Sequence, residues 1–186
     1  CQQMGMPCGG FRVATNQNDI LHRFFTTGSY QEGEVKPSHA PSMDIQAASN
    51  FERYLYYRLN GDQNKVRETM VRMKAGEQVT LPHVDSSFRS TRMDDETIPK
   101  AISQVWKDYQ YVADPHTACA FTDMAQDRVS VVLSTASPAK FPEVVQAETG
   151  SEPIHPSLEI LKSKALQTYP MEATAIAVKA FLRSKV

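Results

Sequence analysis

The amino-acid sequence predicts an α/β fold, and two observations support this prediction. A strand, a polar turn and a helix follow one another twice, over residues 11–28 and 128–149. The segments between and after them carry apolar residues at helical spacing. Strands that alternate with helices are typical of a parallel sheet covered by helices. With 186 residues, the chain is long enough for one domain with a sizeable core.

Charge and hydropathy exclude several classes of protein. The chain carries 20 basic and 21 acidic residues, whereas a nucleic-acid-binding domain needs a basic excess or a basic face. No apolar run approaches the roughly 20 residues of a membrane-spanning helix. We therefore expect neither a nucleic-acid partner nor a membrane partner.

The cysteines and histidines predict no disulfide framework and no metal site. The cysteines at positions 1, 8 and 119 are odd in number and widely spaced. We therefore expect a reducing, cytoplasmic location. No CxxC pair and no helical pair of histidines is present, which argues against a zinc site. Because the chain starts at Cys1 and soon enters a strand, we also expect a piece of a longer protein.

The first strand–turn–helix unit begins with "FRVAT", residues 11–15, a short strand. Asn16 or Asn18 is expected to cap the helix that follows, and Gly28 to end it. Residues 29–49 read as a loop. The apolar face of the helix would contain Ile20, Leu21, Phe24 and Phe25.

Two further helices are predicted next. Asn50 is a candidate cap for a helix that starts at Phe51, and Gly61 with Asp62 would end it. A second helix is marked by three apolar residues that we expect in the core. These are Val66, Met70 and Met73, and residues 75–93 then read as irregular with one short extended piece.

The segment "DDETIPKAISQVWKDY" predicts a well-formed amphipathic helix. Asp95 fits as its cap, and Pro99 falls in the first turn, where a missing N–H costs little. The expected buried stripe comprises Ile98, Ala101, Ile102, Val105, Trp106 and Tyr109.

The last third of the chain holds the second strand–turn–helix unit. "YVADPHTACAFTDMAQ" predicts an extended piece and then a helix, with Asp114 as cap and Pro115 at the first helical position. "RVSVVLS", residues 128–134, is the clearest strand, and its weak alternation predicts burial on both faces. Ser137 would then cap a helix that starts at Pro138. That helix would turn Phe141, Val144 and Val145 inward, and two more helices are expected near 157–168 and 171–184.

Three polar turns would lie at the carboxyl edge of the sheet, where open parallel sheets bind ligands. They are "ATNQND", "ADPHTA" and "STASPAKFP", each before a helix N-terminus that favours anions. Capping alone also explains Asn, Asp and Ser at such places. His116 is either a polar residue of the helix start or a base, and Lys140 either a solvated cation or a ligand contact.

Four ordered motifs resemble one known family. "ATNQNDILHRFF", "PSMDIQAASNFERYL", "DPHTA" and "LSTASPAKFPE" together are similar to threonine synthase of the microbial and fungal type, over about residues 1–149. The resemblance implies part of a tryptophan-synthase β-like (fold type II) three-layer α/β domain with additional helices. Residues 1–149 would be the C-terminal part of a catalytic region that binds pyridoxal 5'-phosphate, and 150–186 a helical extension.

The resemblance also implies an activity. Threonine synthases convert O-phosphohomoserine and water to threonine and phosphate, which makes them lyases of threonine biosynthesis. Their Schiff-base lysine lies in a Phe-Lys-Asp motif, and a "GNFGD"-like loop holds the cofactor phosphate. Both would precede this stretch in a missing N-terminal part, so no catalytic residue is expected here and the fragment alone should be inactive.

Site residues follow from the same resemblance. Thr135 would hydrogen-bond the pyridine nitrogen of the cofactor, and Ser134 would shape the same edge. Lys140 matches the "PAKF" lysine of the family, which has no covalent role, and Ser137 stands where the family usually has His. The candidates on the second shell or the substrate side are Asp114, His116, Asn16, Asp19 and Lys140.

Three other functions remain open at this point. The protein could be a threonine-synthase-like phospho-lyase that acts on another O-phosphorylated amino acid. It could be a non-catalytic fragment that serves as a binding module. It could also be an unspecified α/β ligand-binding domain, which four motifs in the family's order disfavour.

Overall fold

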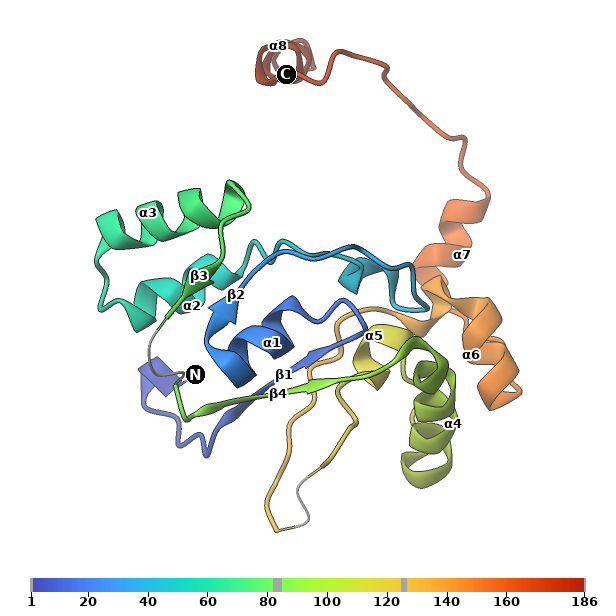
Figure 1. Ribbon diagram of the computed structural model, residues 1–186. Coiled ribbons are helices and arrows are strands. Elements are labelled where there is room, and N and C mark those ends of the chain that lie inside the picture. Colours follow the sequence, from blue (N-terminus) through green and yellow to red (C-terminus); the bar gives the residue numbers. More distant parts are fainter. Residues whose placement is uncertain (1, 82–84, 125–126, 186) are drawn as a thin grey trace. The chain divides into compact units, whose positions relative to one another are not determined.

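The computed structural model describes residues 2–81, 85–124 and 127–185 (Figure 1). By its internal contacts the chain divides after Ile154 into two units. The first unit contains the strands and the two clusters of buried apolar residues, and the second contains two short helices.

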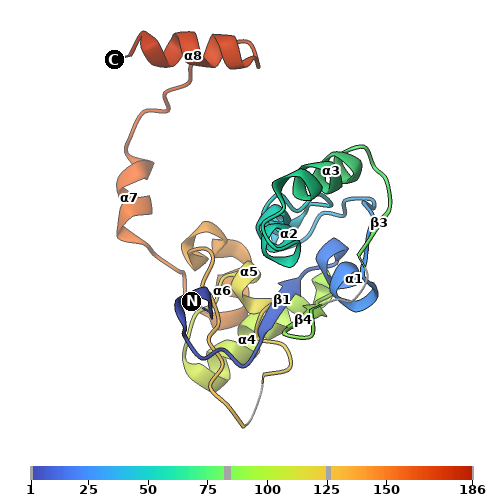
Figure 2. The same cartoon turned by 90° about the vertical axis from the view of Figure 1, so that its left-hand side faces the viewer.

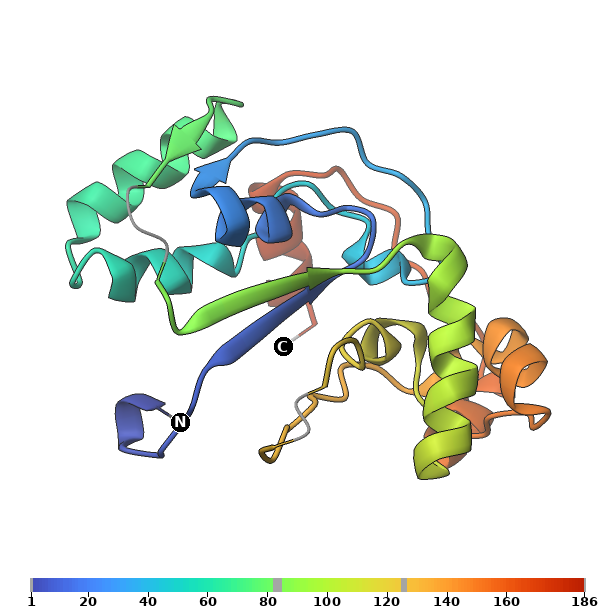
Figure 3. The ribbon, with the colours of Figure 1, turned by 60° about the horizontal axis from the view of Figure 1, so that its bottom comes forward.

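A pair of parallel strands lies at the centre of the first unit. β1 (Phe11–Thr15) pairs with β4 (Phe88–Arg92), with Thr15 opposite Arg92 (Figure 3). β1 confirms the predicted strand, and β4 is the extended piece expected within 75–93, although residues 82–84 of that range lie outside the described residues. The expected loop 29–49 contains β2 (Ser29–Tyr30), which pairs antiparallel with β3 (Val79–Thr80).

The two faces of β1 pack against different layers. Val13 contacts a cluster rich in aromatic residues, whereas its neighbour Ala14 contacts a second, mainly aliphatic cluster. Successive side chains of a strand point to opposite faces, so the sheet lies between two layers. This arrangement agrees with the expected three-layer α/β class.

The first layer consists of α1 (Ile20–Thr27), α2 (Phe51–Arg58) and α3 (Gln63–Lys74), which Figure 2 shows side by side. The rings of Phe24 and Phe51 meet edge to face with centroids 4.6 Å apart. Met73 is buried and Met70 packs against the cluster, as predicted. The buried members are Ile20, Phe24, Phe25, Tyr30, Ala48, Phe51, Leu55, Val66, Met73 and Val79.

The expected caps of this layer need correction. Asp19, not Asn16 or Asn18, occupies the N-cap of α1, because the Asn16 side chain accepts the N–H of Asn18 in a turn just before the helix. Asn50 takes the N-cap position of α2 but makes no side-chain cap bond. Gly28 ends α1 as predicted, with a left-handed φ of 77° and its N–H on the carbonyl of Phe24.

The second layer consists of α4 (Ile98–Tyr109), α5 (Pro115–Ala118) and α6 (Pro142–Thr149). The predicted stripe of α4 is correct for Ile98, Ile102 and Val105, but Tyr109 is 59% exposed. The predicted segment after Asp114 forms only one helical turn, and residues 125–126 of that segment lie outside the described residues. The buried cluster comprises Ala40, Met93, Ile98, Ile102, Val105, Ala113, Ala118 and Cys119.

Two caps of the second layer were predicted wrongly. Asp95 opens a 3-10 turn, η3 (Asp95–Thr97), and its carboxylate accepts the backbone N–H of His39, so Thr97 precedes α4. Ser137 precedes another 3-10 turn, η4 (Pro138–Lys140), without a side-chain cap bond. The α-helix starts only at Pro142, because the residue before a proline is disfavoured in the helical region.

Residues 128–134 do not form the predicted buried strand. Val129, Val131 and Leu133 are 91%, 77% and 75% exposed. A strand is stabilised by hydrogen bonds to a neighbour, and among the described residues no strand pairs with this segment. The apolar pattern is therefore present without the partner that would make it a strand.

The remaining elements are short. η1 (Gln2–Met4) precedes β1, and η2 (Pro41–Met43) lies in the long loop. The second unit contains α7 (Pro156–Lys162) and α8 (Ala175–Arg183), both shorter than predicted. Within the described ranges, no helix has the length and apolarity to cross a membrane.

Candidate functional site

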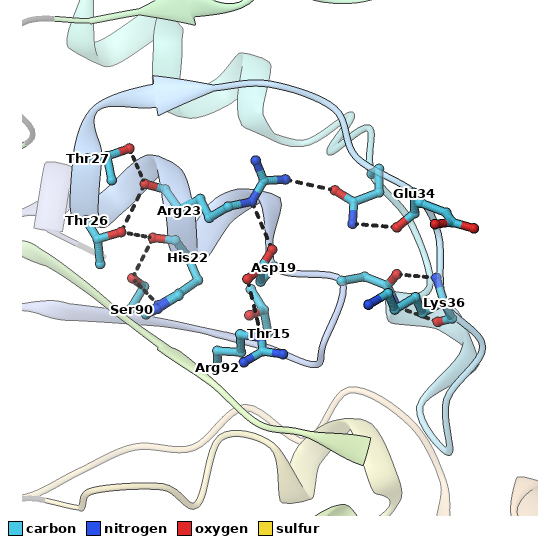
Figure 4. A network of polar contacts seen from close by, with 12 residues as sticks. Thr15, Asp19, His22, Arg23, Thr26, Thr27, Glu34, Lys36, Ser90 and Arg92 are labelled. Atoms are coloured by element: carbon cyan, nitrogen blue, oxygen red, sulfur yellow. Dashed lines mark hydrogen bonds and ion pairs between the residues drawn. The ribbon is translucent and has the colours of Figure 1, made fainter. Parts of the chain in front are cut away.

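The carboxyl ends of β1 and β4 lie at the same edge of the sheet, because the two strands are parallel. The turn after β1 begins there, with Asp19 between two arginines (Figure 4). Its carboxylate accepts a hydrogen bond from Arg23 Nε at 2.9 Å and lies 3.3 Å from Arg92 Nε. Asp19 therefore joins α1 to the end of β4, and both of its oxygens are used within the chain.

Asn16 anchors the loop of residues 36–44 on the end of β1. Its buried side-chain amide donates to Ser38 Oγ at 2.8 Å and to Asp44 Oδ1 at 2.7 Å. Asn18 donates to the same Asp44 oxygen and to the carbonyl of Lys36. These bonds fix the path of the loop over the strand end.

A second polar cluster lies around the short helix α5. Asp114 caps this helix, is 1% exposed and accepts the backbone N–H groups of His116 and Thr117. Its Oδ1 also lies 2.9 Å from His116 Nδ1, and its Oδ2 accepts the hydroxyl of Thr117. The carboxylate thus receives four donors, two from His116 and two from Thr117.

The electrostatics of this cluster favour a charged carboxylate. Burial alone would raise the pKa of Asp114, but the hydrogen bonds from His116 and Thr117 outweigh burial and hold the pKa below its ordinary value. Nε2 of His116 accepts the backbone N–H of Ser42 at 3.0 Å, so this nitrogen carries no proton and Nδ1 donates to Asp114. Both ring nitrogens are engaged, which favours the structural reading of His116 over a general base.

The nearby thiol offers no nucleophile either. Burial, and secondarily the charge of Asp114, raises the pKa of Cys119 to about 12. The neutral thiol donates to the carbonyl of Pro115 at 3.4 Å. Nucleophilic chemistry by a thiolate is therefore not a function of this cluster.

The third polar turn meets the second one at Thr117. The backbone N–H of Thr135 donates to Thr117 Oγ1 at 3.1 Å, and Ser134 Oγ receives the hydroxyl of Tyr111 at 3.1 Å. The Thr135 side chain itself is exposed, and no described residue hydrogen-bonds its hydroxyl. The Thr135 hydroxyl is thus exposed on a backbone that Thr117 anchors.

The structure joins most of the predicted site residues but not all of them. Thr135, Ser134, Asp114 and His116 form one connected set, and Asn16 joins it through the loop that contains Ser42. Asp19 serves the ion pairs described above. Lys140 is exposed in η4, and among the described residues none pairs with its ammonium group.

Sequence reasoning missed Thr117, Ser42 and Asp44. The spacing of Thr117, three residues after a capping Asp, could have indicated a contact with that carboxylate. Its contact with Thr135, 18 residues away, has no local signal. Within the described residues, no group of three His, Cys, Asp or Glu side chains could hold a metal ion.

Comparisons with known proteins agree with these motifs. Residues 116–184 match the family described as "Threonine synthase, C-terminal". Threonine synthase of Pseudomonas aeruginosa is 37% identical over 168 residues, which cover 84% of this chain and 36% of that protein. Threonine synthase-like 2 of Mus musculus is 32% identical over 183 residues, 91% of this chain and 38% of that protein.

Comparison of folds also finds similarity to threonine synthases. A crystal structure of PLP-bound threonine synthase from Brucella melitensis superposes with a TM-score of 0.74 at 36% identity, over 84% of this chain and 36% of that one. This likeness confirms the α/β, fold type II class. The chain spans a little over a third of the length of these relatives. By sequence, motif order and fold, the chain belongs to the threonine synthase family.

Proposed function

We propose that the protein to which this chain belongs is a pyridoxal-phosphate-dependent threonine synthase. It converts O-phosphohomoserine and water to threonine and phosphate. Residues 1–149 contribute the C-terminal part of the catalytic region, and 150–186 a helical extension. The Schiff-base lysine and the phosphate loop come from an N-terminal part, as the family resemblance implies.

The observation that carries this proposal is the open hydroxyl of Thr135. Its backbone is held by Thr117, while its side chain is exposed and lacks a partner among the described residues. A neutral hydroxyl suits a pyridine nitrogen, because it can donate one hydrogen bond without adding charge. When bound, pyridoxal phosphate supplies the electron sink that the reaction needs. The neutral Thr135 hydroxyl would hydrogen-bond the ring nitrogen without protonating it.

The other candidate residues support the surface around Thr135. Ser134, held by Tyr111, lies beside Thr135 and shapes the same surface. Asp114 and His116 hold the cluster beneath it. Asn16 and Asp19 fix the loop and the helix after β1. Lys140 is proposed as a substrate-side cation for a phosphate group, because it is exposed and no described carboxylate neutralises it.

A second candidate function is a phospho-lyase that acts on a different O-phosphorylated amino acid. Threonine synthase-like 2 of Mus musculus is similar to 91% of this chain, so the similarity is not restricted to proteins named threonine synthase. Thr135 and Ser134 would face the cofactor, and not the substrate, in either case. Only the substrate can separate the two candidates.

The experiment is to express the complete reading frame that contains this chain and to measure three properties. Bound pyridoxal phosphate is measured by absorbance, and phosphate release is measured with O-phosphohomoserine and, separately, O-phosphoserine. We expect cofactor binding and release from O-phosphohomoserine. Release from O-phosphoserine alone would favour the second candidate, and a protein that binds no cofactor would contradict both.

A matched pair of variants tests the residue assignment. Thr135→Ala should weaken cofactor binding by roughly two- to tenfold, because it removes one hydrogen bond worth about 0.5–1.5 kcal/mol. Thr80→Ala, an exposed threonine of β3, should leave cofactor binding unchanged. Equal cofactor affinity of the Thr135→Ala and Thr80→Ala proteins would contradict the role of Thr135.

A further inference from the structure

We propose that Thr117 is a positioning residue for Thr135: the Thr117 hydroxyl sets the backbone from which Thr135 presents its side chain. The functional consequence rests on the proposed function, in which Thr135 faces the cofactor. The contact itself belongs to this chain and can be tested without the cofactor.

The direction of each hydrogen bond follows from the chemistry of the groups. A threonine hydroxyl has one proton and two acceptor lone pairs, and an ionised carboxylate only accepts. Thr117 must therefore donate its proton to Asp114 Oδ2. Its lone pairs are then free to accept the N–H of Thr135, at 3.1 Å. A hydroxyl without the Asp114 carboxylate could rotate its proton toward Thr135 and lose this contact.

The same reasoning extends these hydrogen bonds from Asp114 to the loop after β1. Asp114 Oδ1 accepts from His116 Nδ1, and His116 Nε2 accepts the backbone N–H of Ser42. Ser42 lies in η2, in the loop that Asn16 and Asp44 hold at the strand end. Four hydrogen bonds of fixed direction thus connect Ser42 to Thr135 through the buried side chains of His116, Asp114 and Thr117.

Thr135 needs such support because its own segment is weakly held. Residues 129–136 belong to no helix or strand. Within the described chain, their hydrogen bonds are those from Tyr111 to Ser134 and from Thr135 to Thr117. Of these two, only the Thr117 contact fixes the backbone. The backbone torsions of Thr135, and with them the direction of its hydroxyl, therefore depend on Thr117.

The experiment compares Thr117→Val, which removes the hydroxyl, with Thr117→Ser, which keeps it. The first readout is amide hydrogen exchange of Thr135 in the cofactor-free protein. We expect exchange to become roughly two- to tenfold faster in the valine variant, as for the loss of one hydrogen bond, and to stay near wild type in the serine variant. Thr122→Val is the matched control, because it removes a nearby hydroxyl that bonds the carbonyl of Cys119 instead.

The second readout is cofactor affinity, measured by titration of the complete protein with pyridoxal phosphate. Thr117→Val should weaken affinity by up to about tenfold, and Thr117→Ser should restore it. Should the valine variant not fold, Asp114→Asn decides. Its amide would donate to Thr117 instead of accepting the Thr117 proton, which could then turn toward Thr135, so the Thr135 amide should exchange faster there too.

The outcomes separate the two proposals. Unchanged exchange at Thr135 in Thr117→Val, or in Asp114→Asn where the valine variant does not fold, would overturn the positioning role. Equal loss in the valine and serine variants would also overturn it, because packing rather than the hydroxyl would then matter. The wild-type protein could also fail to bind the cofactor while the Thr135 amide still exchanges faster in Thr117→Val. That result would uphold the positioning of Thr135 and contradict the proposed function.

Discussion

Two segments of this chain were predicted as strands, and they behave in opposite ways. "FRVAT" is short and of modest apolar character, yet it forms β1 and pairs along its full length with β4. "RVSVVLS" has the stronger strand pattern, yet it is exposed and belongs to no strand. The difference lies in their neighbours, because β1 has a pairing strand and a layer on each face.

This comparison separates two kinds of signal. A cap such as Asp114 or a stop such as Gly28 satisfies backbone groups within a few residues, so its outcome follows from local sequence. A strand needs hydrogen bonds and packing from distant segments. The relatives are nearly three times longer than the matched stretch, and the partners of 128–134 are expected in their remaining part.

The largest effect should come from the layer that supports β1. Phe24 is 1% exposed and its ring contacts those of Phe25, Phe51 and Tyr54. Phe24→Ala should lower the free energy of unfolding by about 3–5 kcal/mol, as for other buried Phe truncations. Denaturant titration of the chain measures this value. Tyr57→Ala on α2, which removes a ring that is 60% exposed, is the control and should change it by less than about 0.5 kcal/mol.

The next effect should come from the best locally determined element, the turn at Asp114. Asp114→Ala removes a buried acceptor of four hydrogen bonds and leaves their donors without a partner. We expect a loss of about 2–3 kcal/mol in unfolding free energy, more than the roughly 1 kcal/mol of an ordinary cap. A loss no larger than that of an exposed cap would show that the cluster adds nothing to the cap.

The same carboxylate predicts a pH dependence of stability. The pKa of Asp114 in the folded chain is below its ordinary value, because the hydrogen bonds from His116 and Thr117 outweigh burial. The contribution of Asp114 is therefore complete above its unfolded pKa of about 3.9 and is lost as pH falls through the lower folded pKa. The stability gap between wild type and Asp114→Asn should narrow over that acid range. A gap independent of pH would contradict the assignment.

The fold was predictable wherever the signal was local. The positions of α1, α2, α3 and α4 followed from apolar spacing, and Gly28, Asp114 and Pro115 marked ends and starts correctly. The pairing of β1 with β4 was not predictable, because 72 residues separate Thr15 from the start of β4 at Phe88 by the numbering, and no turn chemistry links them. The caps at Asp95 and Ser137 failed because a 3-10 turn intervenes before each helix.

The candidate site was predictable in its residue types and only partly in its connections. Thr135, Ser134, Asp114 and His116 were named from polar turns and from the family resemblance, and they lie in one connected set. The link through Thr117 and the link through Ser42 depend on how α5 packs against two loops. Contacts between residues so far apart in the chain leave no periodic pattern in the sequence, so they could not be predicted from it.

A smaller effect tests a purely local signal. Gly150 ends α6 with a left-handed φ of 74°, and a Cβ atom there would meet no atom within 4 Å. Gly150→Ala should therefore cost about 1 kcal/mol of unfolding free energy from backbone strain alone. Gly9→Ala, which also meets no atom but lacks a left-handed φ, is the matched control and should cost nothing. An equal loss of unfolding free energy in both variants would show that left-handed backbone strain is not the cause.

The smallest effect should come from the segment that did not become a strand. Leu133 is 75% exposed, so Leu133→Ala should change the unfolding free energy of this chain by less than about 0.5 kcal/mol. In the complete protein the same substitution should cost about 2–5 kcal/mol if other strands bury the segment. Measuring both proteins by denaturant titration tests the comparison directly. A small cost in both would mean that residues 128–134 stay unpaired, and that their apolar pattern does not mark a missing neighbour.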